Sequence, residues 1–284
     1  MATVLVTGAT GNIGAPLTRM LVEAGVSVRV LTRRLDEARS SLGDNVLLTE
    51  GGIEDASAVA AALDGAEQVF FLSRTTPEIG EAAKAFLALA KDAGVRRVVA
   101  TSSSTVALEP SVAMGRWHAD LESALVASGL GWTALRPGNF ASNTLRWAGS
   151  IRSKATVFAP YAGAVSAPID PFDIAAVAFA ALTSSGHDAK VHTLTGPELM
   201  TPRKQTGVLG HVLGRPISLI ELTEDRAREG MIAGGMPPFM ADAIVELLRA
   251  SAGEELITST VREITGRDAR SFETWAREHR SQFV

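Results

Sequence analysis

Short apolar runs rich in β-branched residues alternate with helical patterns along the first half of the chain, and this alternation constrains the fold more than any other feature. The runs occupy residues 3–7, 26–32, 46–50, 68–73, 97–102 and 132–136. Strands that alternate with helices are typical of right-handed βαβ units around a parallel sheet. Because the runs are almost continuously apolar, we expect helices on both faces of the sheet. The expected fold class is α/β, with a Rossmann-type, doubly wound parallel sheet.

The alternation weakens after residue 137, where glycine and proline become frequent. Helical spacing predicts helices over residues 174–182 and 202–213, and Phe272 and Trp275 are expected to anchor a core near the C-terminus. We therefore expect a first domain over residues 1–137. A smaller C-terminal lobe is expected over residues 138–284, interleaved with the last strands of the sheet.

Composition excludes several classes of function. The chain has no cysteine, which excludes disulfides, thiolate catalysis and thiolate metal sites, and we expect no metal site. A formal net charge of -4 gives no basic field for nucleic acid. No apolar run approaches the ~20 residues of a membrane span, and the N-terminus has no room for a signal peptide, so a cytoplasmic protein is expected. The sequence leaves the oligomeric state open.

Three glycines, Gly8, Gly11 and Gly14, follow the first apolar run and open the first helical pattern. Glycines in this context permit a tight turn, a close approach of pyrophosphate and close packing of the helix on the strand, and the helix N-terminus attracts phosphate. We favour a dinucleotide site over three glycines in an ordinary βα turn. Asn12 is expected to be the N-cap, with Pro16 in the first turn. The expected cofactor contacts are Gly8, Thr10, Gly11, Asn12, Ile13 and Gly14.

The choice of cofactor depends on the end of the second run. An NAD site places Asp or Glu there to bind the ribose 2′-OH, but this chain has Arg33 and Arg34, and no carboxylate precedes Asp36. Two guanidinium groups are suited to a 2′-phosphate. NADP(H) is therefore favoured over NAD(H), with a solvated basic pair as the alternative.

With these residues in place, the chain resembles the atypical short-chain dehydrogenase/reductases, specifically the NmrA-like proteins and the allied NAD(P)H:quinone oxidoreductases. The likeness runs almost end to end and rests on the glycine turn, Arg33 and the segments at residues 70–73, 101–103, 135–140, 173–175, 194–197, 265–267 and 271–273. It implies that residues 1–137 form an NAD(P)-binding domain and that the later lobe holds the substrate. Further cofactor contacts implied are Phe71, Leu72, Ser73, Ser102 and Pro137.

The chain departs from the superfamily at the catalytic Tyr-x-x-x-Lys pair. Met114 stands at the tyrosine position and His118 at the lysine position, with Glu122 four residues further on. The chain's only tyrosine, Tyr161, lies far downstream and is not carried over. Residues 50–52 read Glu-Gly-Gly, where many relatives have Gly-Asp near the adenine, so that contact is not carried over either.

The missing tyrosine restricts the kind of acceptor that such a site could reduce. Reduction of a simple ketone needs a positioned acid, whereas a reduced quinone leaves a phenolate-like anion whose conjugate acid has a pKa of about 10, comparable to tyrosine. Hydrogen bonds alone can stabilise such an anion, without proton transfer from an acid. The resemblance implies Ser103 and His118 as the catalytic residues. The alternatives are that Ser103 caps the next turn and that His118 faces solvent or pairs with Glu122.

The C-terminal lobe is expected to hold a small apolar or aromatic substrate. Phe140, Trp147 and Met236 are the candidate contacts, and the methionine- and glycine-rich segment 230–240 is suited to a lid. Core packing is the alternative for each of these methionines.

The sequence is consistent with two functions, one enzymatic and one non-catalytic. The first is an NADPH-dependent oxidoreductase that transfers hydride to a quinone or another activated, conjugated or aromatic carbonyl acceptor. The alternative is a non-catalytic, NmrA-like sensor of NADP(H) redox state that acts through a protein partner. His118 and the compact length favour the first, and Met114 favours the second. We favour the enzyme.

Overall fold

The computed structural model describes residues 2–108, 111–250 and 256–284. They form two compact units that alternate along the chain. The first unit comprises Met1–Ser103, Arg116–Pro137 and Pro171–Thr193, and the second comprises Ser104–Gly115, Gly138–Asp170 and Leu194–Val284. The chain thus changes unit after Pro137, while residues 171–193 return to the first unit. It also leaves the first unit over Ser104–Gly115, a detail that the sequence did not indicate.

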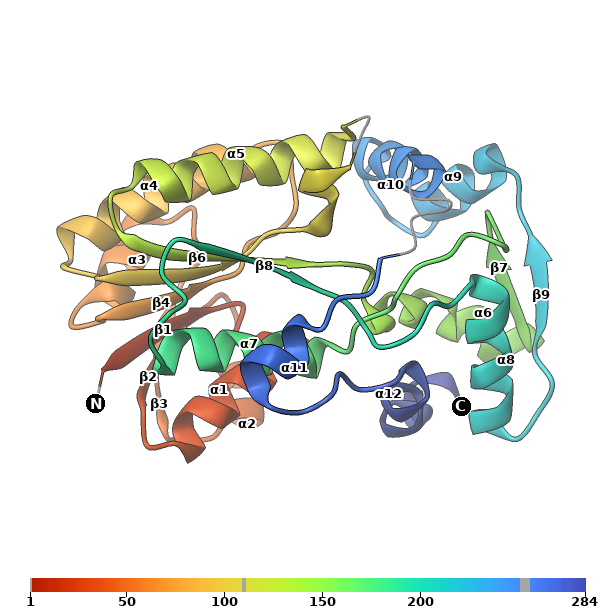
Figure 1. The fold of residues 1–284 in the computed structure, drawn as a ribbon, viewed down its shortest axis with the longest axis horizontal. Coiled ribbons are helices and arrows are strands. Elements are labelled where there is room, and N and C mark those ends of the chain that lie inside the picture. The colour runs from red at the N-terminus through yellow and green to blue at the C-terminus, as the bar shows by residue number, and fades with distance from the viewer. Residues whose placement is uncertain (1, 109–110, 251–255) are drawn as a thin grey trace. The chain divides into compact units, whose positions relative to one another are not determined.

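A seven-stranded sheet forms the first unit, in the order β3-β2-β1-β4-β5-β6-β8 (Figure 1). Its strands are β1 (Thr3–Thr7), β2 (Ser27–Thr32), β3 (Val46–Glu50), β4 (Gln68–Phe71), β5 (Arg97–Thr101), β6 (Gly131–Pro137) and β8 (Lys190–Leu194). Each adjacent pair from β3 to β6 is parallel. The six predicted strands are all present, with ends within two residues of the expected positions. The predicted Rossmann-type α/β fold is confirmed.

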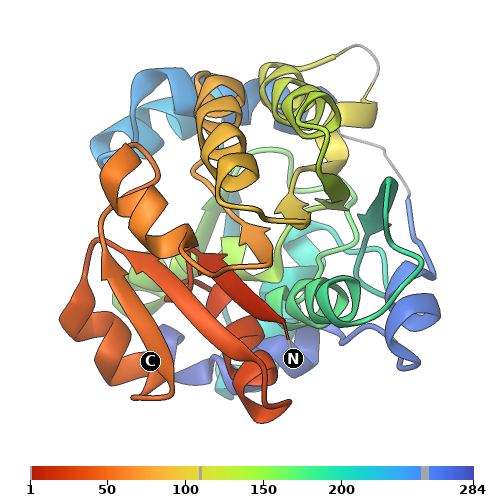
Figure 2. The same ribbon diagram turned by 90° about the vertical axis from the view of Figure 1, so that its left-hand side faces the viewer.

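Helices cover both faces of this sheet, as the apolar character of the strands predicts. Figures 1 and 2 show α1 (Gly14–Glu23), α2 (Leu35–Leu42) and α7 (Pro171–Thr183) on one face, and α3 (Ala56–Leu63), α4 (Ile79–Asp92) and α5 (Ala113–Ala127) on the other. On the second face, Leu5 and Phe71 from the sheet pack into one core with Phe86 of α4 and Leu121 of α5. The glycines after α3, α4 and α5 all have positive φ, as expected for helix ends.

The second unit has its own core. Its elements before α9 are η1 (Ser104–Ala107), η2 (Ala141–Trp147), α6 (Ala148–Lys154), β7 (Thr156–Ala159), α8 (Pro202–Leu213) and β9 (Ser218–Glu221). Strands β7 and β9 pair in parallel as a separate two-stranded sheet. Elements α11 (Thr260–Thr265), α12 (Phe272–Glu278) and η3 (Arg280–Phe283) complete the unit. Phe272 and Trp275 are 1% exposed and stack with ring centroids 5.6 Å apart, which confirms them as core anchors.

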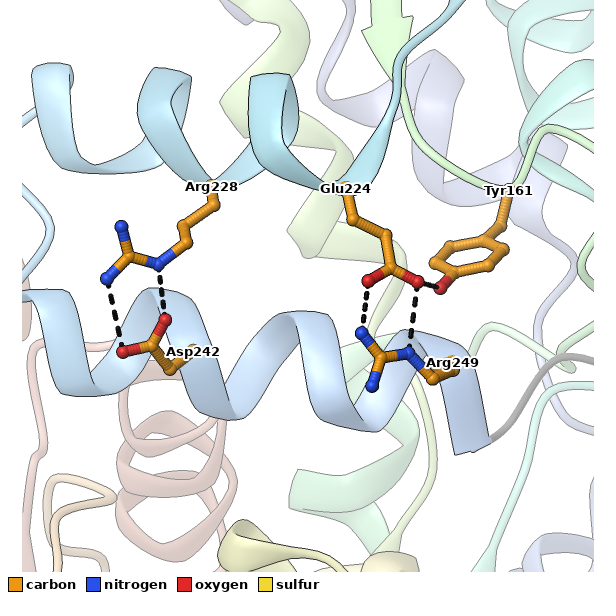
Figure 3. Close-up of polar contacts among 5 residues, drawn as sticks. All are labelled: Tyr161, Glu224, Arg228, Asp242 and Arg249. Atoms are coloured by element: carbon orange, nitrogen blue, oxygen red, sulfur yellow. Dashed lines mark hydrogen bonds and ion pairs between the residues drawn. The ribbon is translucent and has the colours of Figure 1, made fainter.

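Segment 230–240 lies in a helical hairpin of the second unit, which consists of α9 (Glu224–Ala233) and α10 (Pro238–Ala250). Figure 3 shows two guanidinium–carboxylate pairs that join these helices, Arg228 with Asp242 and Arg249 with Glu224, and the Tyr161 hydroxyl on Glu224. Hydrogen bonds from Arg249 and Tyr161 lower the pKa of Glu224 to about 2, so this carboxylate stays ionised at physiological pH. Residues 230–240 thus comprise the end of α9, a short turn and the start of α10. Their role as a lid stays a prediction.

No helix in the described part of the chain combines the length and the apolar character that crossing a membrane requires.

Candidate cofactor and active site

The glycine turn at the carboxyl end of β1 has the geometry that a dinucleotide phosphate requires. Gly8 has φ +66°, and the Gly11 amide donates a hydrogen bond to the Gly8 carbonyl at 3.0 Å. A Cβ atom at Gly14 would lie 2.2 Å from that carbonyl oxygen. Only glycine therefore lets α1 begin so close to the end of the strand, and the turn fits a pyrophosphate placed against its backbone.

Helix α1 begins at Gly14, and its N-cap is Ile13, which makes no side-chain capping bond. The prediction that Asn12 caps this helix is wrong, because the helix begins one residue later than that role requires. Pro16 falls in the first turn, as expected. The first turn is therefore left without a side-chain cap, and its positive dipole end suits an anion.

Thr7 connects the glycine turn to the end of β4, the strand beside β1 in the sheet. Thr7 Oγ1 donates to the Leu72 carbonyl at 2.9 Å and accepts from the Leu72 amide at 2.8 Å. A Cβ at Gly8 would lie 2.9 Å from Leu72 Cδ2, so the glycine turn and the segment after β4 are close neighbours. The Phe71 side chain is buried against Phe86, which leaves only its backbone for a ligand. Sequence reasoning did not identify Thr7.

Both arginines after β2 are engaged by carboxylates. Arg33 binds Glu54 through two hydrogen bonds, Nε to Oε1 at 3.1 Å and Nη2 to Oε2 at 2.7 Å. Arg34 pairs with Glu37 in the first turn of α2. The Arg33 guanidinium holds the pKa of Glu54 below its usual range. Glu54, in the loop after β3, is a second residue that sequence reasoning missed.

His118 of α5 is buried, with 5% of its surface exposed. Its Nε2 lies 3.3 Å from Thr75 Oγ1, while its Nδ1 is buried with no hydrogen-bond partner among the described residues. It does not face solvent, so that alternative is wrong. Glu122 acts on it through its charge, without a hydrogen bond among the described residues. Burial lowers the pKa of His118 to about 4, against the opposing charge of Glu122. The imidazole is therefore neutral at pH 7, a form that can take part in hydrogen bonds but carries no positive charge.

Burial of a neutral His118 makes folding stability depend on pH. In the unfolded chain the imidazole takes up a proton near pH 6.5, whereas in the folded chain it does so near pH 4. Lowering the pH from 7.5 to 4.5 is therefore expected to remove about 2 to 3 kcal/mol of stability through this group. Urea unfolding at both pH values checks this. The His118→Gln variant should lose less on acidification, and an identical pH dependence in both proteins would contradict the assignment.

A half-buried hydrogen-bond network lies beside His118. Glu122 accepts hydrogen bonds from Ser102 Oγ at 2.5 Å and from Arg136 Nε and Nη2 at 2.8 and 2.6 Å. It thereby ties α5 to the carboxyl ends of β5 and β6. Ser102, expected to contact cofactor, directs its hydroxyl to this network. Ser103, half-buried, is the next residue at the end of β5.

The remaining residues predicted to contact cofactor or substrate are divided between the two units. Pro137 ends β6 and is buried, and Thr10 and Ser73 are half-buried within the first unit. Trp147 is 6% exposed and belongs to the core of the second unit. Phe140 is half-buried just before η2, and Met236 is half-buried in the turn between α9 and α10. The substrate contacts stay predictions.

One described cavity lies on the α9–α10 hairpin. It measures about 210 Å³ and is lined by six charged side chains and Val245. This chemistry does not suit an apolar acceptor, so the cavity is not the expected substrate pocket.

The fold, glycine turn and uncapped helix end define an NAD(P)H-binding protein of the Rossmann class. The model of the NAD(P)H-binding family matches residues 8–185. The chain belongs to that family, and it is an NAD(P)H-dependent oxidoreductase.

Named relatives cover the whole chain. The chain is 40% identical over 284 residues to (4-alkanoyl-5-oxo-2,5-dihydrofuran-3-yl)methyl phosphate reductase of Streptomyces griseus, covering 99% of each chain. It is 33% identical to NAD(P)H azoreductase of Xenophilus azovorans, again over 99% of each. The NADPH complex of an Escherichia coli quinone oxidoreductase has the same fold, with a TM-score of 0.84, 21% identity and coverage of 97% of this chain and 99% of that one.

Proposed function

We propose that this protein is an NADPH-dependent reductase that transfers hydride to a quinone or another activated, conjugated or aromatic acceptor. The observation that carries the proposal is the buried, neutral His118 on α5, with methionine four residues before it in place of tyrosine. A site of this kind offers a hydrogen bond to a developing anion but no strong acid.

Hydride transfer and stabilisation of the product anion are carried out by different groups. Bound NADPH supplies the hydride. Thr75 holds Nε2 of His118, which leaves Nδ1 to hydrogen-bond the cofactor ribose or the acceptor oxygen. Ser103 provides a second hydroxyl at the end of β5. Because a quinone accepts hydride to give a phenolate-like anion, these hydrogen bonds suffice, and water supplies the final proton.

The relatives support an acceptor of this kind. Their names describe reduction of an azo compound, a quinone and an alkanoyl-oxo-dihydrofuran, in each of which the reducible bond is activated by conjugation. A small aromatic or conjugated substrate is therefore the substrate class that we propose. The preference for NADP(H) over NAD(H) is part of the same proposal and rests on Arg33 and Arg34, which present two guanidinium groups after β2.

A panel of acceptors tests the proposal. Pure protein is mixed anaerobically with NADPH and a benzoquinone, an azo dye, an acyl-dihydrofuranone phosphate or cyclohexanone, and loss of the reduced-nicotinamide absorbance is followed. We expect turnover with one or more of the activated acceptors and none with cyclohexanone. The His118→Ala variant should lower kcat by about 10² with the accepted substrate, the usual effect of removing one donor to a developing anion.

Two results would overturn the proposal. Tight binding of NADPH without turnover of any acceptor would favour the sensor instead. Unchanged kcat in the His118→Ala variant would remove this imidazole from the mechanism.

A further inference from the structure

Glu54 lies at the edge of the sheet where a Rossmann fold binds the adenosine ribose. NADP(H) and NAD(H) differ at the 2′ position of this ribose. Strands β2 and β3 end side by side, with Thr32 paired to Glu50, and the Gly51 amide donates to the Thr32 carbonyl at 2.9 Å. Arg33 follows the first strand, and Glu54 lies in the loop after the second. In a Rossmann sheet the adenosine ribose binds at these carboxyl ends, with its 2′ position toward the end of β2.

The contact between the two side chains is bidentate. Both oxygens of Glu54 accept hydrogen bonds from Arg33, at 2.7 and 3.1 Å. A Cβ at Gly52 would lie 2.2 Å from Glu54 Oε1, so the glycine leaves room for this carboxylate beside the loop. The neighbouring Asp55 is engaged instead in capping α3, where it accepts from the Ser57 and Ala58 amides. Glu54 is thus the carboxylate of this loop that is directed to the arginine.

This carboxylate has opposite consequences for the two cofactors. The fork of Arg33 that suits a 2′-phosphate already holds Glu54, and a phosphate that binds there must displace a negative charge or accept its repulsion. A ribose 2′-OH is a neutral donor, and carboxylates at this edge of Rossmann sheets accept a hydrogen bond from it. The pair is exposed, with 57% of Arg33 and 63% of Glu54 accessible, so breaking it costs little.

We infer that Glu54 sets the cofactor preference of this enzyme. Its carboxylate competes with the 2′-phosphate of NADPH for Arg33 and accepts the 2′-OH of NADH, so that one site binds both forms. The inference rests on the proposed function only in taking Arg33 as the phosphate-binding residue.

Dissociation constants for NADPH and NADH, measured by fluorescence titration at fixed ionic strength, test the inference without turnover. The proteins are the wild type, Glu54→Gln, Arg33→Ala, the double variant and Asp64→Asn. Asp64 is exposed at the opposite end of α3, so its variant makes the same charge change away from the site. Thermal unfolding of each variant confirms that it folds.

We expect Glu54→Gln to bind NADPH about two- to fivefold more tightly, the range for releasing one exposed ion pair, and NADH more weakly. The gain for NADPH should disappear in the Arg33→Ala background, and Asp64→Asn should leave the ratio of the two constants unchanged. Equal shifts for both cofactors, or no shift, would overturn the inference. A change in the ratio without turnover of any acceptor in the panel would instead overturn the proposed function and leave the inference standing.

Discussion

The Gly14→Ala variant is expected to bind NADPH and NADH about 10- to 100-fold more weakly than the wild type. The added methyl group would lie 2.2 Å from the Gly8 carbonyl oxygen and 2.7 Å from Ala9 Cα, both of them backbone atoms that no side-chain rotation relieves. The strand end and helix must move apart, at a cost of about 1 to 3 kcal/mol, and the phosphate-binding geometry is lost with them.

Titration of both cofactors, together with the melting temperature, checks this result. Gly207→Ala is the matched control, because a Cβ on that glycine of α8 would have nothing within 4 Å. It should leave affinity unchanged and stabilise its helix by about 0.5 to 1 kcal/mol. Unchanged cofactor affinity in Gly14→Ala would mean that the turn does not hold the phosphates.

Removing one side of the Glu122–Arg136 pair is expected to cost about 3 kcal/mol of stability. Only 13% of Glu122 and 21% of Arg136 is exposed, and the remaining charge would be left buried without its partner. Urea unfolding of Glu122→Gln and Arg136→Met measures the loss. Arg136→Met in a Glu122→Leu background should recover much of it, because apolar side chains then fill the space. A loss below about 0.5 kcal/mol in both single variants would show that the pair behaves as an exposed one.

Local patterns were sufficient to predict the fold. The apolar runs predicted at residues 3–7 and 46–50 have the same ends as β1 and β3. Strand β1 is mostly buried and β3 is a partly exposed edge strand, but both are rich in apolar residues. The glycine turn was predicted equally well, because each of its three glycines is required for a separate steric reason. Strand β8 was not predicted, because only its last residue is buried and polar residues interrupt its sequence. Strands β7 and β9 were not predicted either. Each has four residues and is partly exposed, so neither carries the long apolar run by which the others were recognised.

The candidate site was less predictable because its polar contacts join distant parts of the chain. Thr7 and Leu72 are 65 residues apart, and Arg33 and Glu54 are 21 apart. No spacing rule links such pairs before the strands are placed side by side. His118 was identified through family resemblance, but its burial and its bond to Thr75, from the loop after β4, required the three-dimensional structure. Trp147, a predicted substrate contact, packs in the core of the second unit, a position that the sequence did not indicate.

The alternation of the two units along the chain also governs how the protein can be made. The first unit is assembled from three separate stretches, the last of which supplies α7 and most of β8. A fragment ending at Pro137 would leave β6 as an unprotected edge strand and would lack α7, one of the three helices on its face of the sheet. On the ribosome, the sheet cannot be completed until nearly 200 residues have been synthesised. Truncation is therefore the wrong route to a minimal nucleotide-binding module from this chain, and any such module would have to keep residues 171–193.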